Sequence, residues 1–138
     1  MTTTTTLVDF GVLHGVQDLL DAQEFADLVR FAMVSYDGYV AEMQAHATDP
    51  QRLRSAAHKL KGSAGSLGLQ RLGALAALIE AHGAPALALH LPQLLQALAQ
   101  TRAELVRAGL LDASAEAATV PVVASRAAVA EAEIDFQL

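Results

Sequence analysis

Residues 50–69, PQRLRSAAHKLKGSAGSLGL, contain the clearest helical pattern of the chain. At about 100° per residue, one side of such a helix is apolar and consists of Leu53, Ala56, Leu60, Ala64 and Leu67. The opposite side consists of Gln51, Arg54, Ser55, His58, Lys61, Gly62 and Gly65. Pro50 suits the first helical position after an Asp49 cap, and Gly68 suits the end of the helix. The segment therefore predicts an amphipathic helix from Pro50 to about Leu67 that points His58 away from the core.

Further helices are predicted on both sides of this segment. Of the 138 residues, 53% are hydrophobic and only 4% are aromatic, and Ala and Leu dominate, which favours helices over strands. Thr6 is a candidate cap for the first helix, and Asp21 with Glu24 forms a capping-box pattern before the second. The expected helices cover residues 7–20, 22–43, 69–82 and 92–109. Residues 83–91, which contain Pro85, are expected to form a loop or one loose turn.

Four long helices with short connections predict an all-α protein, an antiparallel four-helix bundle with an extra short N-terminal helix. The bundle is expected to occupy residues 1–109. Residues 110–138 are rich in Ala and Val and are expected to form a C-terminal tail or linker, with one modest helical signal at 125–134.

The composition argues against several classes of protein. The chain has no cysteine, so disulfides and cysteine-based metal or redox chemistry are excluded. No apolar run approaches the roughly 18 residues that would span a bilayer, and the first residues lack the order of a signal peptide. A cytoplasmic location is therefore expected. The net charge of −6 argues against nucleic-acid binding.

The positive charges are concentrated around His58. No acidic residue occurs between Pro50 and Ile79, whereas five of the nine cations of the chain lie there, namely Arg52, Arg54, Lys59, Lys61 and Arg71. Such a basic window is either a solvated helix face or a surface that attracts an anion or an acidic partner. Its charge alone does not distinguish the two.

The glycines beside His58 favour the second interpretation. Gly62 and Gly65 follow His58 on the same helix face, and each costs roughly 0.5–1 kcal/mol relative to Ala. They lie on the wrong side for a close helix crossing, so bare backbone there lets another protein approach His58. A neutral imidazole, with an unperturbed pKa of about 6.5, has a ring nitrogen that can attack phosphorus. Lys61, one turn on, would offset the charge of a phosphoryl group.

These residues resemble a known family. Residues 57–63, AHKLKGS, followed by Leu67-Gly68-Leu69, are similar to the core motif of histidine-containing phosphotransfer (HPt) domains. The wider resemblance covers about residues 7–108 and includes the helix before the motif and Leu78-Ile79-Glu80 after it. It implies a helical bundle that serves in phosphorelays.

The resemblance also implies roles for individual residues. His58 would be the phosphorylated residue, Lys61 the cation that stabilises the phosphoryl group, and Gly62 the small residue that permits access. Glu80 falls where the family often has a side chain bonded to the other imidazole nitrogen; the alternative for Glu80 is a solvated surface carboxylate. Residues around His58 are expected to contact the partner: Arg54, Ser55, Gly62 and Gly65. Exposed apolar residues of the first two helices, such as Phe10 or Leu13, would complete that surface.

The expected function is to accept phosphate from the aspartyl phosphate of a receiver domain and to pass it to another receiver. Mg²⁺ is expected on the receiver, and this chain is expected to hold no cofactor and no ATP site. The partners would be receiver domains of response regulators or a hybrid histidine kinase. The alternative is a helical interaction module that binds receiver or kinase domains without phosphotransfer. A di-metal centre is disfavoured because no Glu-x-x-His sequence occurs.

Overall fold

The computed structural model describes residues 6–112, and in this range it contains five α-helices and no strand. The helices are α1 (Phe10–Gln17), α2 (Ala22–Ala45), α3 (Pro50–Ser66), α4 (Gln70–His82) and α5 (Ala84–Arg107). The prediction of an all-α protein is confirmed. The tail predicted at 110–138, with its helical signal at 125–134, lies almost wholly outside the described residues. None of the helices described is both long enough and apolar enough to cross a membrane.

Local capping explains where α2 and α3 begin. The Asp21 carboxylate accepts a hydrogen bond from the Glu24 amide at 2.8 Å, and Glu24 accepts one from the Asp21 amide at 3.0 Å. This is the predicted capping box. At the start of α3, Asp49 accepts from the Arg52 amide at 3.2 Å, and Pro50 takes the first helical position.

The first helix starts later than predicted. Asp9 caps α1, because its Oδ1 accepts from the amides of Gly11 and Val12 at 3.0 and 3.3 Å. Thr6 therefore lies outside the helix. The short side chain of Asp9 satisfies two amides that have no partner inside the helix.

The loop predicted at residues 83–91 is wrong, because α5 begins at Ala84. Pro85 lies in the first turn, where its missing N–H is not needed, and Gly83 makes the preceding turn with a φ of 75°. Pro92 lies inside α5 and is exposed. The turn between the two prolines buries Ala86 and Leu87, so packing on the core outweighs the local preference of proline.

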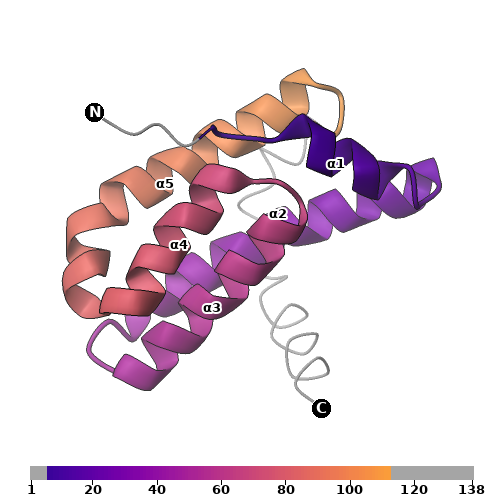
Figure 1. Ribbon diagram of the computed structural model, residues 1–138. Helices are drawn as coiled ribbons and strands as arrows, with labels where there is room; N and C mark the ends of the chain where they lie inside the picture. Colours follow the sequence, from indigo (N-terminus) through magenta and orange to yellow (C-terminus); the bar gives the residue numbers. More distant parts are fainter. Residues whose placement is uncertain (1–5, 113–138) are drawn as a thin grey trace, which may run out of the picture.

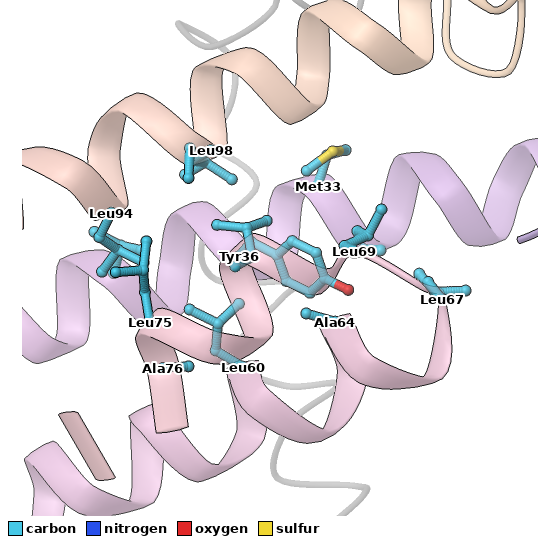
Figure 2. Packing of buried hydrophobic residues seen from close by; sticks show 14 of the residues in the cluster. Met33, Tyr36, Leu60, Ala64, Leu67, Leu69, Leu75, Ala76, Leu94 and Leu98 are labelled. Carbon is cyan, nitrogen blue, oxygen red and sulfur yellow. The ribbon is translucent and has the colours of Figure 1, made fainter. Parts of the chain in front are cut away.

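The helices pack into a bundle in which α3 contacts both α2 and α4, and α4 contacts α5 (Figure 1). Tyr36 of α2 is completely buried at its centre, and Figure 2 shows its ring close to Leu60 and Ala64 of α3. The Tyr36 hydroxyl reaches Ser63 Oγ at 2.8 Å. Tyr36 thus packs against the apolar side of α3, and the polar side of α3 faces outward.

Gly73 of α4 faces the backbone of α3 at ordinary contact distance. A Cβ atom at Gly73 would lie 3.8 Å from the backbone of both Lys61 and Gly65. Glu80 follows two turns later on the same face of α4. The packing of α4 on α3 therefore brings Glu80 to the edge of α3 on which His58 lies.

Candidate functional site

His58 stands on the exposed face of α3, above buried neighbours. Ala57 and Leu60 beside it in sequence are completely buried, whereas the His58 side chain is 66% exposed. Its Nδ1 atom lies 2.7 Å from Oε2 of Glu80, which comes from α4 and is only 18% exposed. One edge of the ring is thus held by the protein, and the rest faces solvent.

Glu80 also binds Lys61. The Lys61 Nζ atom lies 2.6 Å from Glu80 Oε1, so one carboxylate joins the imidazole and the ammonium. The hydrogen bond from Lys61, and after it the one from His58, lowers the pKa of the Glu80 carboxyl. The carboxylate is therefore ionised at neutral pH and only accepts hydrogen bonds.

The ionised carboxylate selects one form of the ring. Because Glu80 accepts at Nδ1, that nitrogen carries the proton in neutral His58. Nε2 then has the free lone pair and lies on the ring edge away from Glu80. The chemical result is a nucleophilic nitrogen on an exposed side chain, with an ammonium group nearby.

The two glycines of this face have open space above them. A Cβ at Gly62 or at Gly65 would meet no atom within 4 Å, in contrast to Gly73. Both are exposed, as are Arg54 and Ser55. The predicted partner-binding residues thus all lie on the outer face of α3 with His58, and no helix of residues 6–112 covers the glycines.

Two features were missed or misplaced at the sequence level. Leu13 is 1% exposed and belongs to the core, so it is not available for docking, whereas Phe10 is half-buried.

The link between Tyr36 and Ser63 was not predicted. A tyrosine in an apolar stripe is the signal for such a link, because its buried hydroxyl needs a partner. Burial is the main cause that raises the pKa of Tyr36 to about 12.

Comparison with known proteins identifies the family of the chain. The family model of the Hpt domain matches residues 15–104, which run from α1 to α5 and include His58, Lys61 and Glu80. The chain belongs to the Hpt domain family. Hpt domains serve histidine phosphotransfer in two-component phosphorelays and interact with receiver domains, so this chain takes part in such a relay. No curated protein and no solved structure matches the chain.

Proposed function

We propose that this chain carries a phosphoryl group on Nε2 of His58. It accepts the group from the aspartyl phosphate of one receiver domain and passes it to another. The observation that carries the proposal is the 2.7 Å contact between Nδ1 and Glu80 on a ring that is 66% exposed. This contact supports a protonated Nδ1 and an available Nε2.

The transfer step uses groups of both proteins. The Nε2 lone pair of His58 attacks phosphorus, the bond from phosphorus to the aspartyl oxygen breaks, and the receiver's carboxylate leaves with the electron pair. The new N–P bond puts positive charge on the ring, and the ionised Glu80 beside Nδ1 offsets it. The reverse reaction with a second receiver returns the ring to its neutral form.

The surface around His58 supports docking of a receiver. Lys61 supplies positive charge toward the transferring group, and Gly62 and Gly65 leave room for the acidic pocket of the receiver. Mg²⁺ belongs to that pocket in this proposal, and this chain needs no cofactor of its own. The proposal includes the cytoplasm as the place where chain and receivers meet.

The test is phosphotransfer from a receiver charged with radiolabelled acetyl phosphate and Mg²⁺. The parent chain is expected to take up one acid-labile, base-stable label, and a His58→Gln variant is expected to take up none. Labelling of His58→Gln at the parent rate would contradict the proposal. A parent chain that binds receivers, measured by calorimetry, yet takes no label from any of them would instead be the interaction module.

A further inference from the structure

Arg54 differs from the other cations of the basic window. It is exposed on α3, four residues before His58, and none of residues 6–112 pairs with it. Arg52, by contrast, contacts His46 at 3.2 Å and Glu42 at 3.7 Å. Lys61 is held by Glu80 at 2.6 Å. Lys59 and Arg71 are also engaged with neighbours.

The positive charge near His58 does not fully neutralise the negative charge of a phosphoryl group bound there. A phosphoryl group on a side chain carries about −1.5 to −2 charges at neutral pH. Lys61 shares its single positive charge with the ionised Glu80, which itself is negative and is hydrogen-bonded to the same imidazole. A second cation is therefore needed on the open side of the ring, where Glu80 does not compete for it.

Arg54 is in the right place to be that cation. Side chains of an α-helix lean toward its N-terminus, so the His58 ring lies over the turn that contains Arg54. Residues four apart have Cβ atoms about 5–6 Å from each other, well within the reach of an arginine. The planar guanidinium donates two parallel hydrogen bonds to phosphate oxygens, a geometry that an ammonium lacks.

We propose that Arg54 binds the phosphoryl group on His58 directly, opposite Lys61. The inference rests on the proposed function of His58 and assigns Arg54 to the phosphoryl group instead of the surface of the receiver. Arg54 and Lys61 then approach the group from successive turns, one before and one after the imidazole. Arg54 is free before phosphorylation and engaged after it.

The experiment uses phosphoramidate, a small donor that has no protein surface. Nε2 of His58 attacks its phosphorus, the P–N bond breaks, and the nitrogen leaves as ammonia. The rate at which the full chain takes up phosphate is measured by phosphorus NMR, together with the chemical shift of the phosphohistidine. Both are compared in the parent chain, Arg54→Gln, Arg54→Lys and Arg52→Gln. Arg52→Gln is the matched control, because it also removes one positive charge from α3.

We expect Arg54→Gln to slow labelling about five- to tenfold, or about 1.0–1.4 kcal/mol in activation free energy. Its phosphohistidine resonance should shift, Arg54→Lys should recover part of the rate, and Arg52→Gln should resemble the parent. Equal rates and shifts in the parent and Arg54→Gln would overturn the inference, as would equal slowing by Arg54→Gln and Arg52→Gln. A parent chain that takes no label from phosphoramidate or from a charged receiver would overturn the proposed function and this inference with it.

Discussion

Glu80 bonds to the imidazole of His58 and to the ammonium of Lys61 with the two oxygens of one carboxylate. Nδ1 of His58 lies 2.7 Å from one oxygen and Nζ of Lys61 lies 2.6 Å from the other. The Glu80 side chain is mostly buried, so its position is fixed by the packing of α4. His58 and Lys61 are both oriented by their bonds to it. Loss of its charge should therefore affect the ring and the ammonium together.

The Glu80→Gln variant tests the effect on the ring. Gln keeps the size of the side chain but offers an amide that can donate as well as accept, so it no longer selects a proton on Nδ1. We expect neutral His58 to be almost entirely protonated on Nδ1 in the parent and to be a mixture of tautomers in the variant. Nitrogen–proton NMR of the imidazole at mildly alkaline pH measures this. Unchanged tautomer populations would remove Glu80 from the site.

The same variant has an expected pH signature. The pKa of Glu80 is lowered from 4.5 by Lys61 and by His58, so the folded protein binds this proton more weakly than the unfolded chain. The resulting stabilisation is fully present above pH 4.5 and is lost as the pH falls through the lower, folded pKa. The free energy of unfolding by urea should therefore fall more steeply below pH 4.5 in the parent than in Glu80→Gln.

At the scale of the helix, α3 contains residues of low helix propensity on its outer face. Its outer face contains Gly62 and Gly65, and no neighbouring atom fills the space where their side chains would be. Packing therefore does not require these glycines, and Ala at either position would favour the helix. In the proposed function, a docking receiver needs that space, which gives the two glycines a role.

Gly62→Ala is expected to have opposite effects on stability and on transfer. The added methyl group should raise the free energy of unfolding by about 0.5–1 kcal/mol, because Ala favours the helix and nothing clashes. Transfer from a charged receiver should slow about tenfold or more, because a displacement of about 1 Å costs up to about a hundredfold in rate.

Gly73→Ala is the matched control for Gly62→Ala. A Cβ at Gly73 faces α3 at ordinary contact distance, with the nearest atoms at 3.8 Å, so it lies away from any receiver. This variant should keep the parent rate. Urea denaturation and single-turnover transfer measure the two effects, and a Gly62→Ala variant with the parent rate would contradict close docking over this face.

The helix ends illustrate what local sequence can and cannot predict. The starts of α2 and α3 were predicted because Asp21 and Asp49 cap amides within their own next turn. The start of α5 differs from the prediction because Pro85 and Pro92 locally favour a break in the helix before residue 92. Their cost depends on position in the turn and on burial of the residues between them, which only the folded chain determines.

At the scale of the whole molecule, some features of the site were also predictable from local sequence and others depend on how the helices pack. The exposure of His58 and its spacing to Lys61 and Gly62 follow from one helix and were predicted from its periodicity. The position of Glu80 depends on how α4 packs, and only the family resemblance indicated it. The bond between Tyr36 and Ser63 joins residues 27 apart, and nothing in the local pattern paired them.

Asp9 joins the N-terminal segment to the turn that follows α3. The amide of Asp9 donates to the carbonyl of Gly68 at 2.7 Å, and its carboxylate accepts from Gln70 at 3.3 Å while it caps α1. This contact sets α1 against the turn between α3 and α4, as Figure 1 shows. The turn itself depends on Gly68, which has a φ of 78°.

Gly68→Ala should lower the stability of the protein by more than the cost of placing Ala at a positive φ. A Cβ at Gly68 would lie 2.6 Å from the Asp9 carbonyl oxygen and 2.9 Å from Val12 Cβ, so α1 must shift. Gly109→Ala is the control, because Gly109 has the same φ of 78° and open space around it. We expect Gly109→Ala to lower the free energy of unfolding by about 1–2 kcal/mol and Gly68→Ala by at least about 1 kcal/mol more. Equal losses in urea denaturation would mean that α1 is not held against the turn.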